Sequence, residues 1–345
     1  MRKMEPLKFG IIGCSRIAKR SVIPAIQKSK FAELEIIGSR STDNAKEFAN
    51  EFNCEKFGTY EDVISDDSVD AVYISTPIDT HAEWSNKVTA AGKHVYVEKS
   101  STYDLKSAIE MVESAKENNV RLMEGFMFRF HPQHQKVKEL IKEGKIGEVK
   151  SFNGIFGFPA FPESDIRYDS GFLRDSGCYP ICASRMIFDE EPLGVFCSQK
   201  KIPESGVDVG GSAILVYENG KTATITYSNG SYYQAKYEVW GTDGVISLDR
   251  AYSVPPDFTT KVTLQYNTEN NWNSRQNEIF EIEPKDHFLE MLDAFCMEIT
   301  GTKKAPFDFE QELLNQARVM FAASHSANQT LSKVFWFEDY PNTNV

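Results

Sequence analysis

The sequence predicts an α/β protein with an N-terminal doubly wound parallel sheet and a C-terminal α+β domain built on a large, open, mostly antiparallel sheet. Two observations predict the first part. An apolar run at 7–12 breaks into a small-residue turn, and short apolar strands then alternate with helices up to about residue 124. Such alternation is typical of parallel strands joined by right-handed crossovers. Beyond residue 149, strands follow one another across turn residues, which indicates antiparallel pairing.

The first strand runs into a turn with the sequence GIIGCSRIA. In a dinucleotide-binding turn, the first glycine permits the bend, and two later positions must be small so that a pyrophosphate and the strand can approach. Gly13, Ser15 and Ala18 stand at these positions, with Arg16 and Ile17 between them. The following helix offers free N–H groups to phosphates. This turn predicts a Rossmann-type site, although small-residue turns also join ordinary strands and helices.

The rest of residues 1–126 continues this dinucleotide-binding domain. Strands are expected at 34–39, 69–75, 94–97 and 120–124, and helices at 44–53, 81–91 and 104–118. Ligands of this fold bind at the carboxyl ends of the strands. The candidate residues at those ends are Ser39, Arg40, Ser75, Thr76, Pro77, Glu98 and Lys99.

Residues 127–345 are expected to form a second domain for substrate binding and oligomerisation. A helix at 133–143 precedes strands at 149–156, 212–217, 222–227, 236–240, 244–249 and 261–266, and helices follow at 286–300 and 309–330. Helices over one face of such a sheet leave the other face open. We expect the open face to carry aromatic residues and to form a homodimer interface, with burial under the chain's own helices as the alternative. The aromatic residues are Tyr227, Tyr232, Tyr233 and Trp240.

Composition excludes several partners. The 345 residues carry a formal net charge of −12, which argues against nucleic acid. No apolar run approaches the roughly 20 residues of a membrane span, and the N-terminus lacks the apolar core of a signal peptide, so no membrane partner and a cytoplasmic location are expected. No metal is expected, because Cys178 and Cys182 lack a second ligand pair. His131 and His134 are interpreted as residues of a helix surface.

The end of the second strand indicates the cofactor. NAD-binding proteins usually place Asp or Glu there, against the ribose 2′-hydroxyl. Here Ser39 and Arg40 follow the strand, and Glu35 lies too early in it. A serine and an arginine can hydrogen-bond and neutralise a 2′-phosphate, and Arg16 in the first turn could assist. The sequence therefore favours NADP(H).

Seven motifs between residues 10 and 256 identify a family. They are GIIGCSRIA, DAVYISTPIDTH, AAGKHVYVEKS, LMEGFMFRFHPQ, IGEV, FLRDSGCYP and YEVWGTDGVISLDRAYSVPP. Together they resemble the glucose–fructose oxidoreductase / inositol dehydrogenase (Gfo/Idh/MocA) family over nearly the whole chain. The resemblance implies a Rossmann domain, a C-terminal domain with an open sheet, and NAD(P)-dependent redox chemistry on sugars or polyols.

The chain departs from this family at two motifs. The EKP tripeptide ends in Ser100 here, so a proline that is often cis is missing. In the DxGxHxxD pattern that begins at Asp175, Tyr179 replaces the histidine and Cys182 the last acid or amide. The tyrosine form resembles glucose–fructose oxidoreductase, dihydrodiol dehydrogenases and 3-ketoreductases of deoxysugar nucleotides more than inositol dehydrogenases.

Three residues match the catalytic needs of such a site. Hydride transfer to a carbonyl forms an alkoxide, which requires a proton donor and a positive charge. Lys99 follows a strand end and matches the family lysine; Tyr179 is a second proton donor, with Asp175 four residues earlier on a helix. We assign proton transfer to Tyr179, and charge stabilisation and substrate orientation to Lys99. Asp175 would hydrogen-bond the sugar or Lys99. The reverse assignment of Lys99 and Tyr179 stays open.

The resemblance also extends the cofactor site. It implies that Glu98 positions the amide or the ribose end of the cofactor. Arg129 and Arg167 are candidates for contacts with substrate or cofactor. The path of the pyrophosphate and the nicotinamide ribose would be lined by Ser75, Thr76, Pro77 and His81.

The resulting hypothesis is an NADP(H)-dependent oxidoreductase that reduces a keto-sugar, with nucleotide-linked sugars included. One alternative is a dehydrogenase of a free sugar or of a trans-dihydrodiol. An alternative from another class is a regulatory protein that binds NADP without catalysis. The retained Lys99, Asp175 and Tyr179 favour an enzyme.

Overall fold

The computed structural model describes residues 5–162, 165, 167–268, 274–329 and 335–336, with backbone alone at 167–168 and 335–336. The chain divides into two compact units. Unit 1 contains the chain up to Met127 together with Phe288–Ala317, and unit 2 contains Phe128–His287 and the chain from Arg318. None of the described helices has the length and apolarity that crossing a bilayer requires.

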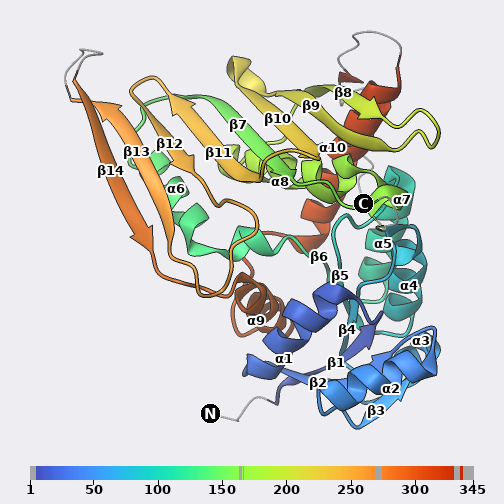
Figure 1. Cartoon of the computed structure of the whole chain (residues 1–345). Helices are drawn as coiled ribbons and strands as arrows, with labels where there is room; N and C mark the ends of the chain where they lie inside the picture. The colour runs from blue at the N-terminus through green and yellow to red at the C-terminus, as the bar shows by residue number, and fades with distance from the viewer. Residues whose placement is uncertain (1–4, 163–164, 166, 269–273, 330–334, 337–345) are drawn as a thin grey trace. The chain divides into compact units, whose positions relative to one another are not determined.

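Unit 1 is built on six parallel strands in the order β3-β2-β1-β4-β5-β6 (Figure 1). The strands are β1 (Leu7–Ile12), β2 (Ala32–Gly38), β3 (Lys56–Gly58), β4 (Ala71–Ile74), β5 (His94–Val97) and β6 (Leu122–Glu124). All residues of β4 are buried, as expected for a central strand covered on both faces. The doubly wound sheet predicted from the sequence is confirmed, and only β3 was not anticipated.

Helices connect these strands. They are α1 (Ile23–Lys28) preceded by a π-helical turn at Ala18–Val22, α2 (Thr42–Glu51), α3 (Tyr60–Ser65), α4 (Ile78–Ala90) and α5 (Leu105–Glu117). Local capping sets several of their starts. Ser41 accepts a hydrogen bond from the Asn44 N–H at the start of α2, and Thr59 and Asp62 form a reciprocal capping box at α3.

Two C-terminal helices extend unit 1, which differs from the division at residues 126 and 127 expected from the sequence. They are α9 (His287–Ile299) and the first part of α10 (Phe309–Asn328). Leu313, Leu314 and Ala317 of α10 belong to the apolar core of unit 1, and the guanidinium of Arg121, just before β6, contacts Glu310 at 2.8 Å and Glu298 at 2.6 Å. Ser29 adds a hydrogen bond of 2.5 Å to Asp293. These contacts join residues that are remote in the sequence.

Unit 2 is built on nine strands in the order β14-β13-β12-β11-β7-β10-β9-β8-β15. Among the strand pairs of the described residues, β7 and β10 alone run in parallel, so the predicted mostly antiparallel sheet is confirmed. The strands are β7 (Val149–Phe158), β8 (Gly194–Lys201), β9 (Asp208–Val216), β10 (Thr222–Asn229), β11 (Gln234–Gly241), β12 (Gly244–Leu248), β13 (Thr260–Asn267), β14 (Arg275–Ile282) and β15 (Phe335–Trp336). The sequence did not predict β8, β14 or β15.

Helices cover one face of this sheet (Figure 1). Both α6 (Pro132–Lys142) and α8 (Cys178–Phe188) pack on its strands and on each other. The shorter helical segments of unit 2 are a 3₁₀ turn at Met127–Phe130, α7 (Arg167–Ser170), a π-helical turn at Leu173–Gly177 and a 3₁₀ turn at Glu218–Gly220.

The predicted aromatic open face needs one correction. Tyr227 alternates with Thr226 on β10 and is 1% exposed, so its ring lies on the covered face. Trp240 is 51% exposed on β11, and Tyr232 and Tyr233 lie in the connection between β10 and β11. The period of two along β10 places Tyr227 with the core residues Ala223 and Ile225.

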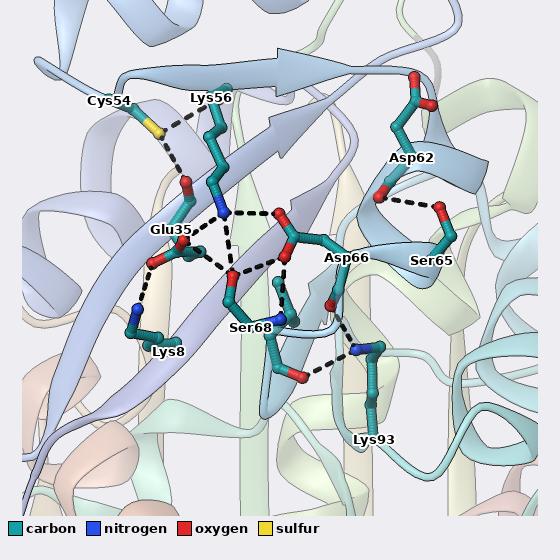
Figure 2. Close-up of polar contacts among 10 residues, drawn as sticks. Lys8, Glu35, Cys54, Lys56, Asp62, Ser65, Asp66, Ser68 and Lys93 are labelled. Atoms are coloured by element: carbon teal, nitrogen blue, oxygen red, sulfur yellow. Dashed lines mark hydrogen bonds and ion pairs between the residues drawn. The ribbon is translucent and has the colours of Figure 1, made fainter.

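An ion-paired network crosses strands β2 and β3, and we call it the Lys56 network (Figure 2). The Lys56 ammonium contacts Glu35 at 2.5 Å and Asp66 at 2.9 Å. Ser68 donates to Glu35 at 2.8 Å, and Lys8 lies 3.1 Å from the other Glu35 oxygen. Lys56 lowers the pKa of both Glu35 and Asp66 below their ordinary values. The carboxylate of Glu35 is thus already paired.

Candidate active site

The first turn of unit 1 is closed against the end of β4. Gly13 has a φ of +106°, a conformation that favours glycine. A Cβ built there would lie 3.0 Å from the Ser75 carbonyl carbon. The Ser75 hydroxyl donates to the Gly13 carbonyl at 2.9 Å, and the Ser15 hydroxyl accepts from the Ala18 N–H at 3.0 Å. Ser15 therefore caps the helix start, where a glycine would provide no side-chain acceptor.

Two arginines, one after β1 and one after β2, take part in no ion pair among the described residues. These are Arg16 and Arg40, and both are exposed. Ser39 is buried beside them and interacts with the Cys14 thiol. Tyr60 lies against Arg40: burial raises the pKa of the Tyr60 phenol, and Arg40 opposes this rise.

His81 joins the loop after β4 to the segment after β5. It is 1% exposed, and its Nε2 lies 2.7 Å from the Thr76 carbonyl oxygen while Nδ1 lies 3.1 Å from that of Ser100. Burial lowers the pKa of His81, and the hydrogen bonds with these two carbonyl oxygens oppose this decrease. The peptide bond between Lys99 and Ser100 is cis. The structure thus brings Thr76, His81 and the Lys99 segment together.

Two carboxylates hold the backbone around Lys99. The Tyr73 hydroxyl of β4 donates to Glu98 Oε1 at 2.8 Å. Burial raises the pKa of Glu98, and the interactions with Tyr73 and Lys99 oppose the rise. On the other side of Lys99, the Ser101 N–H donates to Glu124 at 2.7 Å. Lys99 is therefore carried on a short segment fixed at both ends.

Asp175 and Tyr179 lie on one continuous segment of unit 2. Asp175 belongs to the π-helical turn Leu173–Gly177, and Tyr179 is the second residue of α8. Three rings surround Tyr179: Phe156 at 5.1 Å, edge-on, Phe128 at 5.8 Å and Tyr252 at 5.9 Å between ring centroids. These contacts fix the ring plane and leave the hydroxyl as its polar end.

The predicted site residues divide between the units. Arg129 and Arg167 belong to unit 2: Arg129 Nη1 lies 3.9 Å from Cys182 Sγ on α8, whereas the side chain of Arg167 is outside the described residues. Asp175 and Tyr179 also belong to unit 2. Unit 1 holds Gly13, Ser15, Arg16, Ile17, Ser39, Arg40, Ser75, Thr76, Pro77, His81, Glu98 and Lys99.

The interpretation of His131 and His134 as surface residues is wrong, because both are buried. His134 Nδ1 lies 2.9 Å from the Tyr237 hydroxyl and Nε2 lies 3.0 Å from the Ala251 carbonyl oxygen. His131 Nδ1 accepts from the Gln133 N–H and caps α6. No group of three or more His, Cys, Asp or Glu side chains in the described part of the chain is placed to hold a metal ion.

The sequence analysis did not predict several buried residues that contact the candidate site residues or the segments that carry them. These are Tyr60, Tyr73, Asp208 and Tyr227. A tyrosine inside the fully apolar strand AVYI was the available signal for Tyr73, because a buried hydroxyl requires a partner. Asp208 gave no such signal, since it begins a strand that was predicted to start only at residue 212.

Two family models match the chain. Residues 7–126 match the Gfo/Idh/MocA model described as an oxidoreductase family with an NAD-binding Rossmann fold, and residues 134–247 match the GFO/IDH/MocA C-terminal domain. These matches confirm the resemblance found in the sequence.

Named relatives share most of the chain. A dTDP-3,4-didehydro-2,6-dideoxy-α-D-glucose 3-reductase of Actinomadura kijaniata is 34% identical over 94% of this chain and 96% of its own. The crystal structure of KijD10, a 3-ketoreductase of the same organism in complex with NADP and TDP-benzene, is 33% identical, with a TM-score of 0.87 over 93% of this chain and 98% of its own. A trans-1,2-dihydrobenzene-1,2-diol dehydrogenase of Mus musculus is 30% identical over 72% of this chain and 76% of its own.

Proposed function

The chain belongs to the Gfo/Idh/MocA oxidoreductase family, and from this premise we propose that it is an NADP(H)-dependent reductase of a keto-sugar linked to a nucleoside diphosphate. The observation that carries the proposal is the 34% identity with a dTDP-keto-sugar 3-reductase over 94% of the chain. The family identity gives NAD(P)-dependent oxidoreduction. The position of the keto group is inferred from the relatives.

The residues of unit 1 fit a dinucleotide phosphate. A Cβ would fill the cradle at Gly13, and the helix start behind it offers N–H groups to the pyrophosphate. Arg16, Ser39 and Arg40 would receive the 2′-phosphate, because the arginines have no carboxylate partner among the described residues and Arg40 is steadied by Tyr60. When bound, the nicotinamide supplies the hydride. Glu98 would orient its amide end.

Reduction of a ketone needs charge and a proton at the carbonyl oxygen. In this proposal, Lys99 stabilises the developing alkoxide and orients the sugar, and Tyr179 donates the proton. Asp175 hydrogen-bonds the sugar or Lys99, and Arg129 and Arg167 are further candidates for substrate contact. The reverse roles of Lys99 and Tyr179 are the alternative, which the pH–rate profile of Tyr179→Phe distinguishes.

We also propose that the chain forms a homodimer through the open face of the unit 2 sheet. Exposed apolar residues on this face support the proposal: Ile214 is 43%, Trp240 51% and Ile279 59% exposed. Their register places Ile214 opposite Phe196 and Ile279 opposite Thr263. Sedimentation of the wild type and of Trp240→Glu tests the assembly, and a monomeric wild type would contradict it.

A cytoplasmic location completes the proposal. All six cysteines are free, and free thiols are usual in reducing compartments. Cell fractionation tests this expectation.

A substrate panel tests the proposed reaction. Purified protein is mixed with NADPH and either nucleotide-linked keto-sugars, free keto-sugars or none, and the nicotinamide absorbance is followed. Consumption of NADPH with a nucleotide-linked keto-sugar is the expected result. Activity confined to oxidation of free sugars or trans-dihydrodiols with NADP⁺ would favour a dehydrogenase, a class that includes a D-xylose 1-dehydrogenase (NADP(+)) of Haloferax volcanii, 33% identical over 93% of the chain. Cofactor binding without any turnover would favour the regulatory alternative.

A further inference from the structure

The segment Gly171–Tyr179 carries both unit 2 residues of the proposed site, and we call it the catalytic turn. Within the segment, the Asp175 N–H donates to the Gly171 carbonyl at 3.1 Å and the Ser176 hydroxyl donates to the Phe172 carbonyl at 2.9 Å. Gly171 has a φ of +78°, and a π-helical turn at Leu173–Gly177 then leads into α8 without a side-chain cap at either helix start. Such a turn requires support from outside.

Asp208, the first residue of β9, provides one support. Its Oδ2 accepts a hydrogen bond of 2.7 Å from the Leu173 N–H. The same carboxylate lies directly against Gly171, where an added Cβ would stand 2.1 Å from Oδ1. Asp208 is 6% exposed. Burial raises the pKa of its carboxyl, and the Leu173 N–H, Tyr227 and Arg174 of the turn oppose that rise.

Tyr227 of β10 provides the second support. Its ring fills the space between the turn and the sheet: a Cβ on Gly177 would lie 2.9 Å from Tyr227 Cδ1, and a Cβ on Gly211 would lie 2.7 Å from its hydroxyl oxygen. Burial raises the pKa of the Tyr227 phenol and the charge of Asp208 raises it further, while the Tyr227 hydroxyl has no hydrogen-bond partner among the described residues. Glycines at 171, 177 and 211 therefore leave the space that the side chains of Asp208 and Tyr227 fill, and a Cβ at any of the three positions would clash with one of them.

We propose that Asp208 and Tyr227 are positioning residues that hold the catalytic turn and thereby set the places of Asp175 and Tyr179. Neither touches the reacting atoms in this proposal. Their effect reaches the reaction through the backbone of Leu173 and Gly177. Displacement of a catalytic group by about 1 Å is enough to cost on the order of a hundredfold in rate, so the pair matters for turnover more than for cofactor binding, which belongs to unit 1.

Four variants test this role in the full-length protein. Asp208→Ala removes the acceptor, and Asp208→Asn retains an oxygen for the Leu173 N–H. Tyr227→Phe removes only the hydroxyl. Tyr217→Phe is the control, because the Tyr217 hydroxyl is equally buried in unit 2 and pairs at 2.8 Å with Ser184, which follows the turn on α8.

The kinetic readout rests on the proposed function. Below the melting temperature of each variant, Asp208→Ala should lower kcat by about ten- to hundredfold and shift the pH–rate profile, with the Kd of NADPH unchanged. Asp208→Asn should recover most of the rate, and Tyr227→Phe should lose more rate than Tyr217→Phe at equal loss of Tm. Equal rate losses in the two tyrosine variants, or an Asp208→Ala variant with the wild-type rate and profile, would overturn the proposal.

A second readout does not depend on the substrate. Amide hydrogen exchange of peptides covering residues 171–179 should become about tenfold faster in Asp208→Ala and stay unchanged in Tyr217→Phe. If the wild type reduces no keto-sugar, the proposed function fails, and this measurement still decides whether Asp208 holds the turn. Unchanged exchange in Asp208→Ala would sink the positioning role even in an active enzyme.

Discussion

Glu35 and Arg40 lie on the same short segment of chain and have opposite surroundings. Glu35, within β2, is paired with Lys8, Lys56 and Ser68 in the Lys56 network. Arg40, just beyond the same strand, is exposed and takes part in no ion pair among the described residues of unit 1. Its neighbour is the Tyr60 phenol, whose pKa it lowers against the effect of burial.

The comparison suggests two roles for charged residues: Glu35 stabilises the fold through its ion pairs, and Arg40 is proposed to bind a ligand. A charge that is already paired within the protein contributes to the free energy of unfolding and is not available to a ligand. An unpaired cation at the carboxyl end of a parallel sheet remains available to an anion. We therefore expect substitutions at the site end to change activity and leave Tm alone, and substitutions in the network to do the reverse.

Lys99→Met should give the largest effect on kcat and the clearest test of the difference between the site and the Lys56 network. Loss of the charge at the developing alkoxide should lower kcat by roughly a hundredfold or more, with little change in Tm or in NADPH affinity. Lys56→Met is the matched control, since it removes the same group from the network and should lower Tm while retaining kcat. Steady-state kinetics and thermal melts of both variants decide. Near-normal turnover of Lys99→Met would refute its role.

Tyr179→Phe should have an effect of similar size in unit 2. The ring stays packed against Phe156 and Tyr252, so only proton donation is lost. The rate should fall by about a hundredfold, and the pH dependence of kcat should change. A modest loss with an unchanged pH–rate profile would transfer the proton to Lys99 or water. Tyr217→Phe, measured in parallel, reports the cost of losing a buried hydroxyl alone.

Arg40→Ala should weaken NADPH binding about ten- to hundredfold, because a charged hydrogen bond is worth about 1.5–3 kcal/mol. NADH affinity should hardly change, and adding Ser39→Asp should invert the preference. Titration of the wild type and variants with both cofactors measures the ratio. Lys19→Ala is the control, since that nearby cation already pairs with Glu51 at 2.6 Å. Equal affinities of the wild type for the two cofactors would show that the end of β2 was misinterpreted.

Acid should affect the buried histidines and the Lys56 network at different pH values. Burial lowers the pKa of His131 to about 4 and those of His134 and His287 to about 3, from an ordinary value of 6.5. A lowered folded-state pKa means that the unfolded chain takes up protons first, so this stability is complete above pH 6.5 and is lost as pH falls below it. Each of these histidines can lower the free energy of unfolding by up to about 2 kcal/mol at pH 5.

The Lys56 network should respond only in stronger acid. The pKa values of Glu35 and Asp66 are lowered from 4.5 and 3.8, so their contribution persists until pH falls below these ordinary values. Thermal melts from pH 8 to pH 4.5 should therefore show a decline that begins near pH 6.5, and His134→Gln should flatten it. A Tm that stays constant over this range would contradict the assignment of the buried histidines as neutral.

Glu35→Gln should have the smallest effect, and this effect should be on stability alone. We expect Tm to drop by roughly 2–4 °C, with less difference at high salt because the network is partly exposed, and with kcat unchanged. Glu33→Gln, at an exposed position of the same strand, controls for net charge. A loss of activity in Glu35→Gln without a loss of Tm would break the division between the network and the site end.

The sequence by itself determined the elements whose signals are local. Gly13 and its small neighbours marked the first turn, and alternating apolar runs marked the strands of unit 1 to within a few residues. Residues at strand ends, such as Arg40 and Lys99, could be selected because the topology of a parallel sheet gathers those ends at one edge. The strands β8 and β14 were missed because polar residues fill much of the sequences GVFCSQKK and RQNEIFEI.

Only the tertiary structure decided which distant residues support these local features. Arg121 draws α9 and the start of α10 into unit 1 through Glu298 and Glu310, and Asp208 reaches the backbone of Leu173. His134 in α6 likewise pairs with the Tyr237 side chain and the Ala251 backbone. A periodic pattern records which face of an element is apolar, but a hydrogen bond across the fold depends on where two remote segments meet. That meeting is set by packing of the whole unit and leaves no spacing in the sequence to detect.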